Sequence, residues 1–183
     1  ETVKNDSCVI FGIGTIGIMH ALLAKNHGFN KIFCVDIKDE KIDLCDQMNL
    51  GYGINSMTDN FKIIEKQADE GVDLVIIAIS NMEVLKKAIE LVRKGGNILI
   101  FGQPKKNSFC DLDMSQVYSK EVSIHTTYAA SNEDVKTAIS LIKEGSLSIK
   151  RLVTHKFSIE KSKEAFQCAI ENSKAIKVMI TRG

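Results

Sequence analysis

Three glycines stand where the first apolar run of the chain gives way to a helical pattern. Cys8–Phe11 is followed directly by Gly12-Ile13-Gly14-Thr15-Ile16-Gly17. The G-x-G-x-x-G spacing is typical of a loop that binds the pyrophosphate of a dinucleotide when it lies between a strand and a helix. Gly12 permits the tight turn, Gly14 lacks a Cβ that would block the pyrophosphate, and Gly17 lets the helix pack closely on the strand. The N–H groups at the start of the helix then face the phosphates.

A carboxylate follows the second apolar run. Lys31–Asp36 has the pattern of a strand, and Asp36 comes 19 residues after Gly17. A carboxylate at this position accepts hydrogen bonds from both hydroxyls of an adenosine ribose and repels a 2′-phosphate, so we expect NAD to be preferred over NADP. Lys38 is the nearby cation, and no arginine stands close after Asp36 in the sequence to neutralise a 2′-phosphate. The alternative is that Asp36 only caps the helix predicted over Lys38–Met48.

The elements that must position these residues alternate along the chain. DLVIIAI (Asp73–Ile79) is too continuously apolar for a sheet that is wet on one face, and it indicates a central parallel strand. The β-α-β-α order predicts an α/β fold of the Rossmann type, a doubly wound parallel six-stranded sheet with helices on both faces. The other expected strands are Cys8–Phe11, Lys31–Asp36, one around Ile54, Asn97–Phe101 and Val122–Thr127. The expected helices are Thr15–His27, Lys38–Met48, one near Thr58–Ala68, Asn81–Arg93, which Gly95-Gly96 would end, and Asn132–Lys143.

The last part of the chain changes character. An extended run over Leu152–Phe157, a helix near Ile159–Glu171 and a strand over Ala175–Thr181 are expected there. We therefore expect a dinucleotide-binding domain over 1–145 and a C-terminal helix and return strand within 146–183.

Composition excludes several classes of protein. The 183 residues include 24 Lys and Arg against 23 Asp and Glu. This near balance removes the electrostatic case for a nucleic-acid partner. No apolar run is long enough for a membrane span, and the first residues do not resemble a signal peptide, so a cytoplasmic protein is expected. The five cysteines are scattered and lack a C-x-x-C pair, which predicts structural thiols rather than a zinc site.

The whole chain resembles the coenzyme domain of the medium-chain, zinc-dependent alcohol and polyol dehydrogenases, and its tail is most similar to the sorbitol and threonine dehydrogenase-like branch. Besides the glycine motif and Asp36, the resemblance is carried by Lys41, by VRKGGNILIFGQP (Val92–Pro104) and by KEVSIHTTY (Lys120–Tyr128). It continues in LVTHKFSIEKSKEAFQCA (Leu152–Ala169) and IKVMI (Ile176–Ile180).

The resemblance implies a set of cofactor-binding residues. Ile13 through Gly17 would hold the pyrophosphate, and Lys177 would approach the phosphates. Asp36, with Ile37 beside it, and Lys41 would bind the adenosine ribose. Ala78, Ile79 and Ser80 would border the adenine-side ribose and the nicotinamide. The backbone of Phe101, Gly102 and Gln103 would hold the nicotinamide carboxamide, and Thr126 and Thr127 would lie beside the nicotinamide. Ser80 and Thr126 stand where the family often has glycine, and each adds a side chain near the expected path of the cofactor.

The largest departure from the family is an absence. The family's substrate site belongs to an N-terminal GroES-like domain that supplies the catalytic zinc, and no comparable Cys/His/Glu set remains in this sequence. The resemblance thus implies the NAD-binding domain of a dehydrogenase that oxidises a secondary alcohol or polyol by hydride transfer. Zinc and most of the substrate pocket would lie in the missing domain, so no catalytic or metal-binding residue is assigned and this chain alone should be inactive.

Two other functions stay open. A zinc-free, NADP-dependent quinone-type reductase shares the fold but has no acid at the position of Asp36. A non-catalytic NAD-sensing module would not need the return strand Ala175–Thr181.

Strand Val122–Thr127 should form a sheet edge, and an exposed edge favours pairing with a second copy. A homodimer or tetramer is therefore expected. Solvated or dipole-complementing roles are expected for His20 and His27 on the first helix.

Overall fold

The computed structural model describes residues 6–59, 61–147 and 149–182. The chain forms two compact units that divide between Ala130 and Ser131. Each unit is described by itself.

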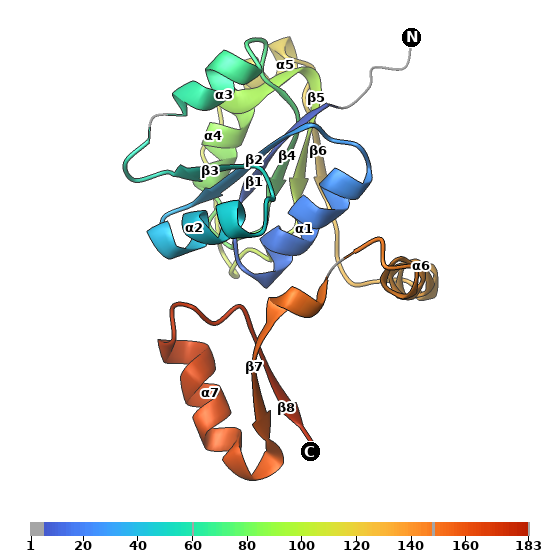
Figure 1. Ribbon diagram of the computed structural model, residues 1–183. Helices are drawn as coiled ribbons and strands as arrows, with labels where there is room; N and C mark the ends of the chain where they lie inside the picture. Colours follow the sequence, from blue (N-terminus) through green and yellow to red (C-terminus); the bar gives the residue numbers. More distant parts are fainter. Residues whose placement is uncertain (1–5, 60, 148, 183) are drawn as a thin grey trace. The chain divides into compact units, whose positions relative to one another are not determined.

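The first unit is built on a six-stranded parallel sheet in the order β3-β2-β1-β4-β5-β6 (Figure 1). Every neighbouring pair in this sheet is parallel. This order places β1 and β4 at the centre and β6 at one edge, and it confirms the predicted Rossmann-type fold. The strands are β1 (Ser7–Phe11), β2 (Lys31–Asp36), β3 (Tyr52–Asn55), β4 (Val72–Ile77), β5 (Val92–Ile100) and β6 (Ser123–Thr126).

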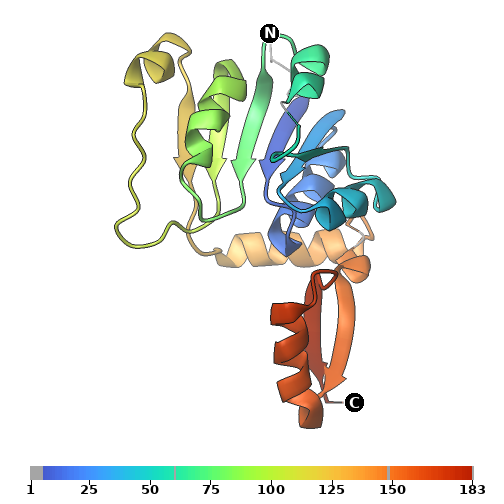
Figure 2. The ribbon, with the colours of Figure 1, turned by 90° about the vertical axis from the view of Figure 1, so that its left-hand side faces the viewer.

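Helices lie on both faces of this sheet (Figure 2). One face carries Val9 and Phe33 and packs in a single core with Ile64 of α3 and Leu85 of α4. Because side chains alternate along a strand, Ile10 points to the opposite face, toward α1. Both faces of the central strands are therefore buried, as the apolar run in β4 predicted. The helices are α1 (Thr15–Asn26), α2 (Asp39–Gln47), α3 (Lys62–Gln67), α4 (Val84–Leu91) and α5 (Met114–Ser119).

The junction of α4 and β5 differs from the prediction. The helix was expected to reach Arg93 and to end at the glycine pair, but α4 ends at Leu91 and β5 begins at Val92. Val72 pairs with Val92, whereas Leu74 already pairs with Asn97, so residues 93–96 form an irregularity within the strand. Gly95, with φ +66°, supplies the left-handed backbone that this irregularity requires. The glycines thus bend the strand and do not end the helix.

A buried carboxylate ties the amino ends of the central strands together. Asp73 Oδ2 accepts hydrogen bonds from the amides of Asp6 and Ser7, both at 2.9 Å, and from Ser7 Oγ at 2.8 Å. Arg93 Nε donates to Asp73 Oδ1 at 2.7 Å. Burial opposes ionisation of this carboxyl, but the hydrogen bonds from Arg93, Asp6 and Ser7 outweigh it and lower the pKa of Asp73 to about 2.

Lys120 stabilises the bend between α4 and β5. Its ammonium donates to the carbonyl oxygens of Ile89, Glu90 and Val92 at 2.7, 2.9 and 3.1 Å. The last carbonyls of a helix lack partners within the helix, so the ammonium satisfies acceptors that α4 leaves open. Desolvation lowers the pKa of Lys120.

The second unit contains one long helix and a small α/β layer. The helix α6 (Asn132–Lys143) begins at a capping box formed by Ser131 and Asp134. The parallel strands β7 (Val153–Ser158) and β8 (Lys177–Thr181) are joined through α7 (Ser162–Glu171). The expected domain boundary lay at residue 145, after this helix, whereas the division into compact units falls before it. The boundary at 145 stays a prediction.

Among the described residues, no helix has the length and apolar character that crossing a membrane requires.

The Asp73 contacts predict a pH-dependent stability. The pKa of Asp73 is lower in the folded chain than its ordinary value of about 3.9, so ionisation favours folding above pH 4. This contribution, about 2 kcal/mol, should be lost as the pH falls from 4 to 2. Urea unfolding at pH 7 should show Asp73→Asn to be about 3 kcal/mol less stable, because Arg93 loses its partner. The exposed Asp69→Asn is the matched control, and equal stability of both variants would contradict this role.

Candidate functional site

The glycine motif forms the turn that its spacing predicted. The Gly12 amide donates to Val35 O at 2.7 Å, and Gly12 has φ +93°. A Cβ at Gly12 would overlap Ile79, and one at Gly17 would overlap the carbonyl of Gly12. Both positions therefore need glycine for close packing, the first for the turn and the second for the approach of α1 to β1.

Gly14 differs from the other two glycines of the motif. It is the N-cap residue of α1, has φ −86°, and a Cβ built there would meet no atom within 4 Å. The protein itself therefore does not require glycine at this position. The open space above Gly14, next to the amino end of a 12-residue helix, fits a pyrophosphate that approaches the backbone closely.

The carboxylate of Asp36 is held by backbone amides from two segments. Ile13 N donates to Asp36 Oδ2 at 2.8 Å, which links the end of β2 to the glycine turn. The amides of Ile37 and Lys38 donate to Oδ1 at 2.8 and 3.2 Å. Asp36 thus contacts the residues that precede α2, but its contact with Ile13 shows that it is more than a cap for that helix.

A groove of about 580 Å³ lies beside Asp36. Its walls come from the ends of β1 and β2, from the segment after β4, and from the start of α4. The exposed wall is mostly apolar in area, although six of the lining side chains, Asp36 among them, are polar or charged. The lining residues are Phe11, Gly12, Val35, Asp36, Ile37, Lys38, Ser56, Phe61, Ile79, Asn81, Glu83, Val84 and Lys87.

The carboxyl ends of β1, β4 and β5 converge next to this groove. Ala78 N donates to Phe11 O at 2.9 Å, and the amides of Phe101 and Gly102 donate to Ile77 O at 3.0 and 2.8 Å. A Cβ at Gly102 would overlap the backbone of Ile79. The structure therefore brings together the expected positions after β4 and β5, with Ser80 and Gln103 exposed immediately beyond them.

The other expected cofactor-binding residues are not part of the groove lining. Thr126 ends β6, is exposed, and pairs with Ile100, and Thr127 follows it. Lys41 lies in the first turns of α2, where its amide donates to Lys38 O. Lys177 is exposed at the start of β8 in the second unit, so its approach to the phosphates stays a prediction.

His20 has a different environment from the solvated one that was expected. Its ring is half-buried and stands edge-on to Phe101, with ring centroids 4.6 Å apart and an interplanar angle of 80°. Burial lowers the pKa of His20. The helical pattern located the residue on α1, but only the fold shows that this side of α1 faces the end of β5. His27, by contrast, is exposed at the C-cap of α1.

The groove also includes residues that the sequence did not single out. Phe61, Asn81 and Lys87 all line it. None belongs to the glycine motif or to a strand end, and no local pattern distinguishes them from other core or surface residues.

The described residues contain no group of three or more His, Cys, Asp or Glu side chains that could hold a metal ion. All five cysteines are free thiols. Burial, and secondarily the charge of Asp73, raise the pKa of Cys8 to about 12. A hydrogen bond with Cys45, together with burial, raises the pKa of Cys34. Both thiols stay protonated at neutral pH, which makes them poor metal ligands.

The fold and the glycine turn define a dinucleotide-binding α/β protein, and comparison with known families makes the assignment more specific. The model of the zinc-binding dehydrogenase family matches residues 15–144. The chain belongs to this family. It aligns with the C-terminal half of relatives that include sorbitol and threonine dehydrogenases.

Two curated relatives illustrate the similarity. A sorbitol dehydrogenase of Halalkalibacterium halodurans is 27% identical over 185 residues, which cover 97% of this chain and 52% of the relative. An L-threonine 3-dehydrogenase of Chromobacterium violaceum is 26% identical over 164 residues, which cover 88% of this chain and 47% of the relative. The chain thus spans about half the length of these relatives.

Solved structures share the fold. One is a short chain alcohol dehydrogenase from Escherichia coli CFT073, complexed with NADH, with a TM-score of 0.86 at 20% identity. The match covers 96% of this chain and 52% of the dehydrogenase chain. A candidate zinc-binding dehydrogenase from Sinorhizobium meliloti 1021, bound to NADP, has a TM-score of 0.85 at 18% identity, with 97% and 53% covered.

Substitution by alanine should affect mainly NAD binding at Gly14 and mainly stability at Gly17. Gly14→Ala should unfold at nearly the wild-type temperature but bind NAD at least tenfold more weakly, because its methyl group enters the open space above the turn. Gly17→Ala should lower the unfolding temperature by several degrees, because its methyl group would overlap the Gly12 carbonyl. Calorimetry of unfolding and of NAD binding checks both. Full NAD affinity in Gly14→Ala would contradict a pyrophosphate site at this turn.

Proposed function

We propose that this chain is the NAD-binding domain of a zinc-dependent dehydrogenase that oxidises a secondary alcohol or polyol. Asp36 is the observation that carries the choice of NAD. Its carboxylate stands at the end of β2, is tied to the glycine turn through Ile13, and opens onto the groove. A negative charge at this position disfavours the 2′-phosphate of NADP.

The hydrogen bonds of Asp36 limit how it binds a ribose. Each carboxylate oxygen has two lone pairs. Both positions on Oδ1 are taken by the amides of Ile37 and Lys38, and one position on Oδ2 is taken by Ile13. Among the described residues no other donor to this carboxylate is recorded, so one position on Oδ2 is open to a ribose hydroxyl. The preference for NAD then rests on one direct hydrogen bond and on charge, where the sequence had predicted bonds from both hydroxyls.

The bound dinucleotide would supply the hydride acceptor. The chain's own residues bind and orient it: the glycine turn holds the pyrophosphate, and the backbone after β4 and β5 borders the nicotinamide. The described residues do not fit a catalytic zinc, so no step that polarises an alcohol is assigned to them. We therefore expect no NADH formation when this chain alone is given zinc, NAD and sorbitol. Turnover under these conditions would contradict this division of roles.

The alternatives differ in what they predict at Asp36. An NADP-dependent quinone-type reductase would not be expected to place a carboxylate beside the ribose, because it repels the 2′-phosphate. A non-catalytic NAD-sensing module would share the glycine turn, but the parallel β7–β8 pair, which matches the family's C-terminal return, favours the dehydrogenase.

An edge strand supports a proposal about assembly. Strand β6 stands at the edge of the six-stranded sheet, pairs only with β5 within the described residues, and its four residues are exposed. Because such an edge presents unpaired backbone groups, we propose that two copies pair through it.

The proposed dimer predicts a solution mass. Light scattering at micromolar concentration should give twice the 20.3 kDa of one chain, or a higher multiple for a tetramer. A mass of one chain at this concentration would contradict pairing through β6.

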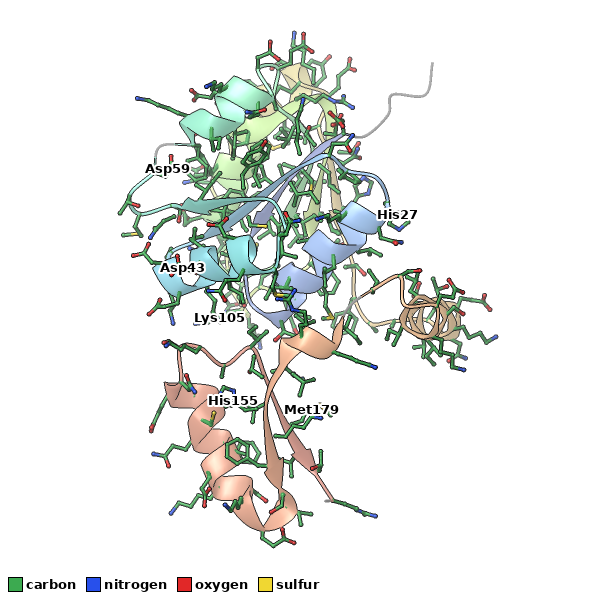
Figure 3. The ribbon with its side chains drawn as sticks, in the orientation of Figure 1. His27, Asp43, Asp59, Lys105, His155 and Met179 are labelled. Atoms are coloured by element: carbon green, nitrogen blue, oxygen red, sulfur yellow. The ribbon has the colours of Figure 1, made fainter. Side chains whose placement is uncertain are left out.

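The cofactor preference can be tested on this chain alone. Titration calorimetry should show NAD bound at least tenfold more tightly than NADP, which corresponds to about 1.4 kcal/mol. Asp36→Asn should reduce this ratio by removing the charge. Asp43 is exposed on α2, so Asp43→Asn removes an equal charge away from the groove and should keep the ratio (Figure 3). Equal binding of NAD and NADP by the wild type would favour the reductase.

A further inference from the structure

Two aromatic rings and one ammonium lie together in the wall of the groove beside Asp36. The centroids of Phe11 and Phe61 are 6.3 Å apart, and Lys87 Nζ lies over the Phe61 ring, 4.9 Å from its centroid. All three residues line the groove. Phe61 is 9% exposed, whereas the side chain of Lys87 is 38% exposed. The ammonium is thus supported by a buried ring while it stays accessible from the groove.

The backbone at Phe61 adopts a conformation that disfavours an aromatic residue. Phe61 has φ +62°, in the left-handed region, where a bulky side chain is strained. Its amide donates a hydrogen bond to Asp59 Oδ1 at 3.0 Å. The Phe61 ring lies in the wall of the groove, beneath Lys87.

The ammonium of Lys87 has unused hydrogen-bonding capacity. It carries three N–H donors. One donates to Glu90 Oε2 at 2.8 Å, and the Phe61 ring lies beneath the group. In the described part of the chain the structure records no other hydrogen bond of this ammonium. At least one N–H is therefore available to an acceptor in the groove.

We propose that Lys87 is a specificity-determining residue that donates a hydrogen bond to a ring nitrogen of the adenine base. This inference rests on the proposed function, since it takes the groove beside Asp36 as the adenosine site. Adenine has a flat apolar face and three ring nitrogens that accept hydrogen bonds. The mostly apolar walls suit the face, and Lys87 suits the acceptor.

The charges around Lys87 favour a neutral base over a phosphate. Glu90 already neutralises the ammonium in an ion pair, and Asp36 also lines the groove. Lys38 and Glu83 line the groove as well, but Glu83 pairs with Lys86, so Glu90 and Asp36 are the charges that would repel an anion beside Lys87. A 2′-phosphate would add about two negative charges to this surrounding. A neutral ring nitrogen gains the hydrogen bond without that repulsion.

Calorimetric titration with ADP-ribose tests the inference, because this probe contains the adenosine but no nicotinamide. Lys87→Met should bind ADP-ribose about tenfold more weakly than the wild type. Lys86→Met is the matched control: Lys86 is the preceding residue on α4 and pairs with Glu83 at 3.3 Å, but it does not line this groove. Lys86→Met should retain wild-type affinity. Glu90→Gln, which removes the ion pair but keeps the ammonium, should bind at least as tightly as the wild type.

Analogues of ADP-ribose with 1-deaza-, 3-deaza- or 7-deaza-adenine identify the contact. The wild type should bind one of these analogues about tenfold more weakly than it binds ADP-ribose. For that analogue, Lys87→Met should cause no further loss of affinity, because the contact is already absent. Equal binding by Lys87→Met and Lys86→Met would overturn the inference, and so would equal sensitivity of all three analogues to Lys87→Met. If Lys87→Met lost affinity for NADP alone and kept its affinity for ADP-ribose, Lys87 would be assigned to the 2′-phosphate instead. No binding of ADP-ribose by the wild type would overturn the proposed function itself, and the inference with it.

Discussion

The close approach of α1 to the end of β1 is the constraint on which the rest of the site depends. Gly17 packs directly on the carbonyl of Gly12, and any side chain at Gly17 would force the helix away from the sheet. This approach places the amino end of α1 above the turn. Ile13, within the same turn, donates to Asp36, so the position of the turn also determines where the carboxylate lies. One steric condition therefore orients both the turn proposed to bind the phosphates and the carboxylate proposed to bind the ribose.

The two ends of the parallel sheet have separate physical roles. At the amino ends, Asp73 is fully paired with Arg93, Ser7 and backbone amides, and Lys120 satisfies the last carbonyls of α4. At the carboxyl ends, the backbone bonds of Ala78, Phe101 and Gly102 draw β1, β4 and β5 together and leave a groove beside Asp36. The contacts of Asp73 and Lys120 thus lie at the amino ends of the strands, whereas the proposed ligand site opens at the carboxyl ends.

Local patterns were sufficient wherever one segment determined its own structure. The G-x-G-x-x-G turn, the burial of β4 on both faces and the helix α6 all followed from spacing and residue type. The prediction was wrong at the end of α4, because the long-range pairing of Val72 with Val92 extends β5 toward the helix. It also missed the packing of His20 on Phe101, which depends on how α1 crosses the end of a strand distant in sequence.

The sequence by itself determined the fold class, the glycine turn, the carboxylate after β2 and the family resemblance, because each depends on short-range periodicity or on spacing along the chain. Only the tertiary structure decided which lone pairs of Asp36 remain open and which side chains line the groove. Phe61 and Lys87 come from different helical segments, and nothing in either segment predicts their contact. Their juxtaposition arises because α3 and α4 pack on the same face of the sheet.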